Sequence, residues 1–362
     1  MVQGKKSEAD RVTEIKWVTV GRQELVTMSN ELIEVTVSPN RGADILSLRH
    51  LPSNAEILWR DPRSLDNPPS DAPGLSDETS FYDGYAGGIQ ELFPNTGPAC
   101  NLFGATLPFH GEACRVAWSA ETAISSGQVS LVTQTFLTRY PFQLQRTMSI
   151  SEGSPSLRIT STVTNLTDRP LPALWAFHPA FGHNLIAGPT RLYGEFDGCV
   201  SHPGPLNGSR TFEAGVRVDL ARLGGPARAL DLLRPESHTG DLLYLTSRTG
   251  WFAIRNERTG LTAAMTWPNE VFRCLWLWQE CHNDSGYPWW GRHHIVGVEP
   301  HSSYPMAGLA DAHSRSDALV VRPGHPLTAT VRLSCDLTPV GASVPAGVST
   351  DGRIHCRPTH EG

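Results

Sequence analysis

The chain of 362 residues lacks the features that mark several large classes of protein. No block of lysines and arginines accompanies its formal net charge of −6, so nucleic acid and anionic membranes are not expected as partners. No apolar run approaches the length of a membrane-spanning helix. The polar start of the sequence also lacks the apolar stretch of a signal peptide, and we therefore expect a cytoplasmic protein.

The cysteines show no spacing that is typical of a disulfide framework or a zinc ribbon. They are odd in number, scattered, and contain no C-x-x-C pair: Cys100, Cys114, Cys199, Cys274, Cys281, Cys335 and Cys356. This arrangement is typical of reduced thiols in the cytoplasm. We expect no disulfide and no structural metal.

Helical periodicity is scarce, whereas strand patterns recur along the chain. Short, largely alternating segments rich in β-branched residues are typical of strands. They cover residues 31–38, 129–136, 142–150, 157–164, 241–245, 251–255, 261–267, 273–279, 294–299 and 328–334. Only residues 219–223 resemble a short helical turn. Many strands without intervening helices predict an all-β fold in which antiparallel sheets pack as a sandwich.

Two long loops interrupt this pattern without dividing it into separate domains. Residues 61–108 are rich in Pro, Gly and Asp and contain several aromatic residues, and residues 281–292 contain a Trp-Trp pair. Loops of this length in a compact domain are usually functional. We predict a single domain over residues 1–337 and a partly disordered C-terminal tail over residues 338–362.

The tryptophans fall into two groups with different expected roles. Trp267, Trp276 and Trp278 lie on strand segments, where they are expected in the core or in the wall of a cleft. Trp289 and Trp290 lie in a loop with Gly and Pro, where they are candidates for stacking on the apolar face of a ligand or for an oligomer contact.

Three short segments each place a proton-handling side chain beside a glycine or a proline. His110 precedes a glycine, and His178 and Glu299 each precede a proline. Such neighbours fix the direction of a side chain, as general acid–base catalysis requires. Each histidine alone has an ordinary explanation, as a hydrogen-bonded residue of a turn or of the core. If the segments converge, two imidazoles and a carboxylate share one cleft.

Two glutamates refine this hypothesis in different directions. Glu299 ends an apolar strand segment, where a carboxylate either needs a partner or has a raised pKa that suits a general base. Glu112 follows His110 by two residues, so both side chains would lie on one face of an extended chain. That spacing also permits a metal site.

Six motifs in order, over about residues 31–334, resemble the aldose 1-epimerase (galactose mutarotase-like) family. They are RGADILS at 41–47, GGIQELFPNTG at 87–97, FHG at 109–111, HPAF at 178–181, VEP at 298–300 and VRPG at 321–324. The resemblance implies a large antiparallel β-supersandwich, in agreement with the strand pattern. Glu112, the Gln90–Glu91 pair, and Ala-Phe-Gly at 180–182 in place of the family's Tyr-Phe-Asn indicate a divergent branch.

The resemblance also implies roles for individual residues. His178 would be the general acid, Glu299 the general base, and His110 a second histidine that holds the sugar ring. Asp241 is the best match for an aspartate that binds sugar hydroxyls. The matching motifs supply Arg41, Gln90 and Asn95 as further candidates for substrate binding. Glu112 beside His110 and Trp290 in the tryptophan loop complete the set. The implied activity interconverts the α and β anomers of an aldose and needs neither a metal nor an organic cofactor.

Two other functions use the same residues. A metal-dependent sugar isomerase or lyase would take His110, Glu112 and His178 as ligands. A non-catalytic carbohydrate-binding protein on the same fold would hold a sugar through its aromatic residues, although binding alone needs no matched acid and base. In each case the expected partner is a small-molecule sugar, and the expected oligomeric state is a monomer or a homodimer.

Overall fold

Antiparallel β-strands make up most of the protein. The computed structural model describes residues 13–61, 77–224, 228–283 and 285–359. The strands in these parts are β1 (Glu14–Val20), β2 (Gln23–Ser29), β3 (Ile33–Ser38), β4 (Asp44–His50), β5 (Ala55–Glu56), β6 (Ile89–Leu92), β7 (Cys100–Leu102), β8 (Ala105–Leu107), β9 (Ser119–Ser125), β10 (Gln128–Phe136), β11 (Phe142–Ser151), β12 (Ser156–Asn165), β13 (Leu171–Ala173), β14 (Ala176–Phe181), β15 (Thr190–Ser201), β16 (Ala229–Asp231), β17 (Gly240–Asn256), β18 (Leu261–Thr266), β19 (Cys274–Cys281), β20 (His294–His301), β21 (Leu319–Val321), β22 (Leu327–Leu337), β23 (Ser343–Val348) and β24 (Ile354–Pro358).

The helices are short. They are α1 (Asp77–Gly84), α2 (His183–Ile186) and α3 (Leu309–Ser314), with single 3-10 turns at η2 (Leu220–Leu223) and η3 (Pro235–Ser237). Asp219 caps the turn expected at 219–223, since its carboxylate accepts a hydrogen bond from the backbone N–H of Ala221. No described helix is long and apolar enough to cross a membrane.

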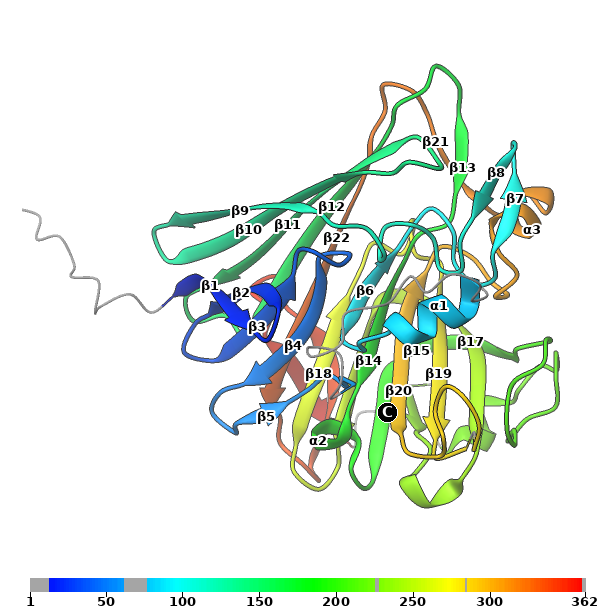
Figure 1. The fold of residues 1–362 in the computed structure, drawn as a ribbon. Coiled ribbons are helices and arrows are strands. Elements are labelled where there is room, and N and C mark those ends of the chain that lie inside the picture. The colour runs from blue at the N-terminus through cyan, green and yellow to red at the C-terminus, as the bar shows by residue number, and fades with distance from the viewer. Residues whose placement is uncertain (1–12, 62–76, 225–227, 284, 360–362) are drawn as a thin grey trace, which may run out of the picture.

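One extended antiparallel sheet connects most of the strands (Figure 1). Its neighbours run β9–β10–β11–β12–β22–β18–β17–β19–β20–β14–β6–β4–β3–β2–β1. The long strand β17 joins two parts of this sheet, because its first half pairs with β19 and its second half with β18. The structure thus confirms the predicted all-β antiparallel architecture.

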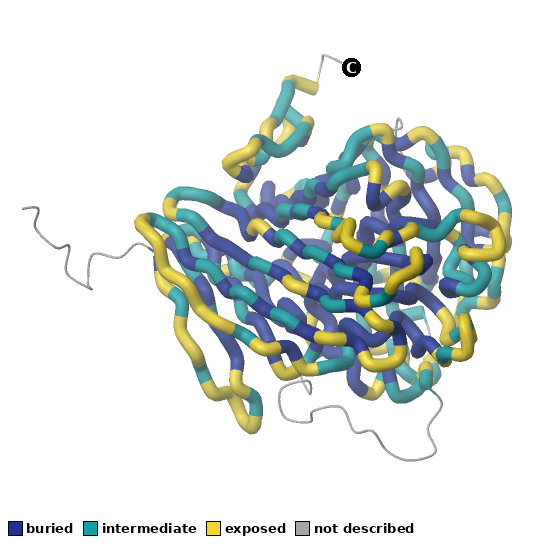
Figure 2. Tube along the Cα trace, turned by 90° about the horizontal axis from the view of Figure 1, so that it is seen from above, coloured by how far each residue is buried: buried dark blue, intermediate teal, exposed yellow. Residues whose placement is uncertain are grey.

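The predicted strands coincide with observed ones because one face of each strand is buried. In β10 every second residue is buried, including Val129 and Leu131, and β12 contributes Ile159 and Val163 to the same main core. Figure 2 shows this alternation of buried and exposed positions along the strands. Burial of such a side chain contributes roughly 1.5–3 kcal/mol. The two segments predicted at 241–245 and 251–255 are one strand, β17.

Two regions differ from the sequence-based expectation. Residues 61–108, expected to be a loop, include α1 and the short strands β6, β7 and β8 among their described residues. The tail beyond residue 337, expected to be irregular, includes the hairpin of β23 and β24, which stands at the edge of the body (Figure 2). The expectation rested on the Gly and Pro content and overlooked Val344 and Ile354, which pack against a small cluster of Tyr193, Ala253 and Ala264. The division into one domain and a tail remains a prediction.

A buried ion pair links strands β6 and β11. Glu91 of β6 accepts hydrogen bonds from Arg146 Nε at 2.6 Å, from Trp175 Nε1 at 2.8 Å and from Ser161 Oγ at 3.0 Å. Arg146 Nη1 donates to the carbonyl of Ala43 at 2.8 Å. Both carboxylate oxygens and the guanidinium are therefore partnered, as a fully buried pair requires. Glu91 has a structural role that its place in the motif at 87–97 did not reveal.

Removal of this carboxylate should strongly destabilise the fold. We expect Glu91→Ala to lower the free energy of unfolding by about 3–5 kcal/mol, because it leaves the charge of Arg146 buried without its partner. Urea unfolding followed by circular dichroism measures the change. Glu14→Ala is the matched control, since it breaks an exposed pair with Lys16 and should cost less than about 0.5 kcal/mol. Equal losses in the two variants would contradict the structural role of Glu91.

Candidate active site

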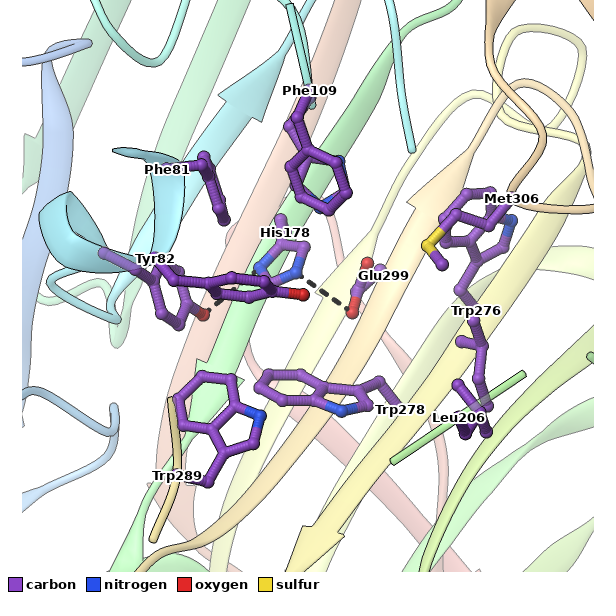
Figure 3. A pocket seen from close by; sticks show the side chains of 13 residues that line it. Phe81, Tyr82, Phe109, His178, Leu206, Trp276, Trp278, Trp289, Glu299 and Met306 are labelled. Atoms are coloured by element: carbon purple, nitrogen blue, oxygen red, sulfur yellow. Dashed lines mark hydrogen bonds and ion pairs between the residues drawn. The ribbon is translucent and has the colours of Figure 1, made fainter. Parts of the chain in front are cut away.

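One pocket contains the three proton-handling side chains singled out in the sequence. His110 lines this pocket together with His178 and Glu299. Figure 3 shows how His178 and Glu299 face each other within it. Aromatic and aliphatic side chains form the rest of its described wall: Phe81, Tyr82, Tyr85, Phe109, Leu206, Leu242, Trp276, Trp278, Trp289 and Met306. The pocket combines a small polar centre with a largely apolar surround, as is usual for sites that bind small molecules.

The polar centre comes from neighbouring strands of the large sheet. The register of β20 with β19 pairs Glu299 with Trp276. On the other side of β20, the pairs with β14 that flank His178 place this residue directly opposite Glu299. Paired residues project their side chains from the same face of a sheet. The register of three strands therefore brings the imidazole, the carboxyl group and the indole together.

His178 and Glu299 form a buried acid–base pair. His178 Nε2 lies 3.5 Å from Glu299 Oε1, and its Nδ1 lies 3.4 Å from the hydroxyl of Tyr85. Burial lowers the pKa of His178 to about 4 and raises the pKa of Glu299 well above its usual range. Both shifts favour the uncharged pair, in which the carboxyl group holds the one proton that the two groups share.

A histidine other than His110 and His178 also contacts the carboxyl group of Glu299. His301 Nε2 lies 3.1 Å from Glu299 Oε2, and the ring stacks on Trp276 with 3.6 Å between centroids and 5° between planes. Burial lowers the pKa of His301 well below its usual range, and Nδ1 has no partner within the described part of the chain. The neutral tautomer with its proton on Nε2 fits these contacts, since it donates to the carboxyl group. Sequence reasoning assigned His301 no role, although residues two apart on a strand share a face.

His110 presents a hydrogen-bond donor to the pocket. Its Nδ1 accepts a hydrogen bond from the backbone N–H of Gly97 at 3.0 Å, and burial lowers its pKa well below the usual range. The proton of the neutral ring is therefore on Nε2. His110 has a φ of 60°, and the following Gly111 has a φ of 81°. A Cβ at Gly111 would lie 2.4 Å from the carbonyl oxygen of Phe93, so this glycine is what lets the turn aim the imidazole.

The aromatic side of the pocket comes from the two long loops predicted to be functional. Helix α1 supplies Phe81 and Tyr82, and Tyr85 follows directly after it. From the loop at 281–292, Trp289 lines the pocket and lies 5.4 Å from Trp278, measured between ring centroids. Trp290, the residue expected from the sequence, is 60% exposed and does not line the pocket.

Two of the expected sugar-binding residues line a separate, smaller cavity beside the pocket. Arg41 and Gln90 lie there with Cys114 and Arg115. Arg41 Nε lies 3.7 Å from the carboxylate of Asp44, to which Gln90 Nε2 donates at 3.0 Å. Gln90 is the partner of His178 in the register of β6 with β14, but its side chain is held by Asp44.

Two further candidates are occupied by structural contacts. Asn95 Nδ2 donates to the carbonyls of Pro98 and Pro108, both at 2.9 Å, and its Oδ1 accepts from the backbone of α3. Both carboxylate oxygens of Glu112 accept from the backbone N–H of Arg139 at 3.1 Å. Neither side chain lines the pocket, because each satisfies backbone groups of nearby turns.

Asp241 also points away from the pocket, and strand alternation explains why. Its Oδ1 accepts from the backbone N–H groups of Thr211 at 3.3 Å and Phe212 at 3.4 Å. The next residue, Leu242, lines the pocket. Since successive side chains of a strand point to opposite faces, only one of these two neighbours can reach the ligand. Asp241 therefore lies on a strand that borders the pocket, but on the face that is turned away from it.

The alternative metal site is not assembled from its expected ligands. Glu112 is held by the backbone of Arg139, away from His110 and His178. Within residues 13–61, 77–224, 228–283 and 285–359, no three His, Cys, Asp or Glu side chains lie together as metal ligands. All seven cysteines lie in these parts of the chain and are free.

Solved structures of sugar-epimerase-like proteins share this fold. A candidate aldose 1-epimerase from Klebsiella pneumoniae matches 89% of this chain and 83% of its own, with a TM-score of 0.66 and 14% identity. A galactose mutarotase related enzyme from Lactobacillus acidophilus matches 86% and 97%, with a TM-score of 0.60 and 16% identity. A galactose mutarotase-like protein from Clostridium acetobutylicum matches 91% and 100%, with a TM-score of 0.61 and 14% identity.

These matches confirm the galactose mutarotase-like β-sandwich expected from the sequence motifs. At such low identities the likeness establishes the fold alone. No protein-family model matches the chain, and no curated protein sequence does so either. The residues of the pocket, and not the fold, therefore indicate the activity.

The environment of His178 predicts an unusual titration. Because burial disfavours the imidazolium, the ring should gain its second proton only as the pH falls toward about 4, instead of near 6.5. Histidine-selective NMR measures this titration, and the signal is assigned by its loss in His178→Asn. A midpoint near 6.5 in the folded protein would show that the imidazole is not in the buried, neutral state described above.

Proposed function

We propose that the protein is an aldose 1-epimerase, which interconverts the α and β anomers of a sugar by opening and closing its ring. The observation that carries this proposal is the buried contact of 3.5 Å between His178 and Glu299 in one pocket with His110. A matched acid and base at the centre of an otherwise apolar pocket suits a reaction that moves two protons on one small molecule. The fold shared with candidate aldose 1-epimerases supports the same activity.

Ring opening uses Glu299 as base and His178 as acid, once the shared proton has moved from the carboxyl group to the imidazole. Glu299 accepts the proton of the anomeric hydroxyl, and the electrons of that O–H bond form the C1 carbonyl. The C1–O5 bond breaks, and its electron pair takes the proton of the His178 imidazolium. Rotation about the C1–C2 bond exposes the other face of the carbonyl, and the reverse transfers close the ring as the opposite anomer. Each proton returns to its starting residue, so no cofactor is consumed.

Burial of the pair assists the opening step. The step begins with a carboxylate and an imidazolium, both in contact with the sugar, and ends with a carboxylic acid and a neutral imidazole. The pocket favours the uncharged pair, because burial raises the pKa of Glu299 and lowers that of His178. Once the charged pair has formed, opening therefore returns it to the uncharged form that the pocket stabilises. General acid and base catalysis contribute roughly 10²–10⁴-fold each.

The other two histidines hold the reacting groups in place. His110 donates from Nε2 to a sugar oxygen, since its Nδ1 is occupied by the backbone of Gly97. His301 donates to Glu299 Oε2, which leaves Oε1 for the anomeric hydroxyl. Gly297 leaves the space for this carboxyl group, because a Cβ there would lie 2.5 Å from Glu299 Oε1.

Replacement of the base tests the proposal. We expect Glu299→Gln to lower the rate of anomer exchange at least about 10²-fold, because glutamine keeps the shape but cannot accept the proton at neutral pH. Exchange NMR over a panel of aldoses measures the rate, with urea unfolding as the control for stability. Near-normal exchange in the variant would overturn the mechanism. Sugar binding by the wild-type protein without any exchange would favour the non-catalytic carbohydrate-binding alternative.

Two substitutions of His301 separate positioning from packing. His301→Phe keeps the stack on Trp276 but loses the donor, whereas His301→Gln keeps an amide donor and loses the stack. Without the donor the carboxyl group should hold the shared proton more tightly. The alkaline limb of the profile of kcat/KM against pH should therefore move to higher pH in His301→Phe and stay near its wild-type position in His301→Gln. Identical limbs in both variants would show that His301 is only a packing residue.

A further inference from the structure

One end of the pocket is lined by carbon and sulfur. Leu206, Trp276 and Met306 lie on the side of Glu299 that is opposite Tyr82 (Figure 3), and Leu242 lines the same pocket. These four side chains belong to a small hydrophobic cluster with Tyr244 and Cys274, apart from the main core. We call this the apolar end of the pocket.

The polar groups next to the apolar end are already paired within the protein. The indole N–H of Trp276 donates to the carbonyl of Ser303 at 3.0 Å. The hydroxyl of Tyr244 accepts from the backbone N–H of Met306 at 2.9 Å and lies 2.5 Å from Nδ1 of His202. These bonds fix the wall and leave its apolar surface to face the ligand.

Strand β17 borders the apolar end, but the carboxylate of Asp241 on this strand points away from the pocket. Asp241 is bound to the backbone of Thr211 and Phe212, and Leu242 takes its place in the pocket wall. A sugar hydroxyl directed here would lose its hydrogen bonds to water and meet a leucine and a thioether instead. Burial of an unpartnered hydroxyl is unfavourable. A phosphate would in addition be desolvated close to the carboxyl group of Glu299.

We propose that the substrate is an uncharged, end-deoxygenated sugar, such as a 6-deoxyhexose, whose methyl group packs against the apolar end. This inference rests on the proposed function for the placement of the hemiacetal oxygens at His178 and Glu299. In a hydrophobic pocket, a difference of one small group between two substrates changes the ratio of their kcat/KM values by about 10–200-fold. The pocket therefore prefers the deoxysugar over its hydroxylated and phosphorylated counterparts.

Matched sugars test the preference. We expect kcat/KM for anomer exchange to be at least about 10-fold higher for 6-deoxyglucose than for glucose, and for 6-deoxygalactose than for galactose. The corresponding 6-phosphates should react more slowly still. Equal rates, or faster exchange of the hexoses or their 6-phosphates, would overturn the substrate class and leave the epimerase function standing.

Binding of unreactive analogues separates the ligand class from the reaction. The 1,5-anhydro forms of the same sugars lack the anomeric hydroxyl and cannot open, so calorimetry reports only their affinity. Tighter binding of the 6-deoxy analogue is the expected result. If it occurs while no aldose is exchanged, the ligand class stands and the epimerase function fails. Unselective binding, or binding of neither analogue, would overturn the ligand class.

A pair of variants at one residue of the apolar end sharpens the test. Met306→Gln has a similar length and shape but offers an amide to a hydroxyl, and Met306→Leu keeps the site apolar. We expect Met306→Gln to reduce the preference for 6-deoxyglucose over glucose about 10-fold, and Met306→Leu to change it by less than about threefold. A similar change of preference in both variants would show that the polarity of the apolar end does not select the substrate.

Discussion

The pocket depends on one constraint, the antiparallel register of β14, β20 and β19. This register places His178, Glu299 and Trp276 in one row on one face of the sheet. A slip of a single residue would turn each side chain to the opposite face. The buried pair of Glu91 and Arg146 guards against such a slip, because it ties β6, which pairs with β14, to β11. A charge network below the pocket thus supports the geometry of the residues within it.

Burial gives the same residues their chemistry. The carboxyl group of Glu299 is buried between the imidazoles of His178 and His301, and Trp276 is its partner on the neighbouring strand β19. In such surroundings a proton is exchanged between neutral groups more easily than charges are created. Under the proposed function the apolar wall serves two purposes: it tunes the acid–base pair, and it selects the end of the sugar that packs beside it.

Side chains whose direction follows from local sequence could be predicted, and those whose direction follows from register could not. The alternating apolar pattern predicted the strands, and the Gly and Pro neighbours of His110, His178 and Glu299 indicated that these side chains have fixed directions. Asp241 was expected to face the pocket, but its neighbour Leu242 does so. Sequence spacing identifies a strand but not which of its faces meets the pocket. The expectation that Trp290 lines the pocket was not met for a related reason. The backbone of its loop decides which of the two adjacent indoles turns inward.

The remaining candidates show a second limit of the sequence. Asn95 and Glu112 have the chemistry of ligand-binding residues, but each satisfies backbone groups that become buried only when the chain folds. These hydrogen bonds depend on contacts between turns that are distant in the sequence, so no local pattern predicts them. The role of His301 was missed for the opposite reason: it adjoins Glu299 in sequence, but its importance lies in a contact of 3.1 Å and in the stack on Trp276.

The central claim is that His178 and Glu299 open the sugar ring at the C1–O5 bond. The most direct measurement follows anomer exchange by NMR with a sugar that carries ¹³C at C1 and ¹⁸O in the anomeric hydroxyl. The account predicts exchange faster than the spontaneous rate with the ¹⁸O retained, since O1 never leaves C1. Exchange accompanied by loss of ¹⁸O in each turnover, or no acceleration with any aldose, would contradict it.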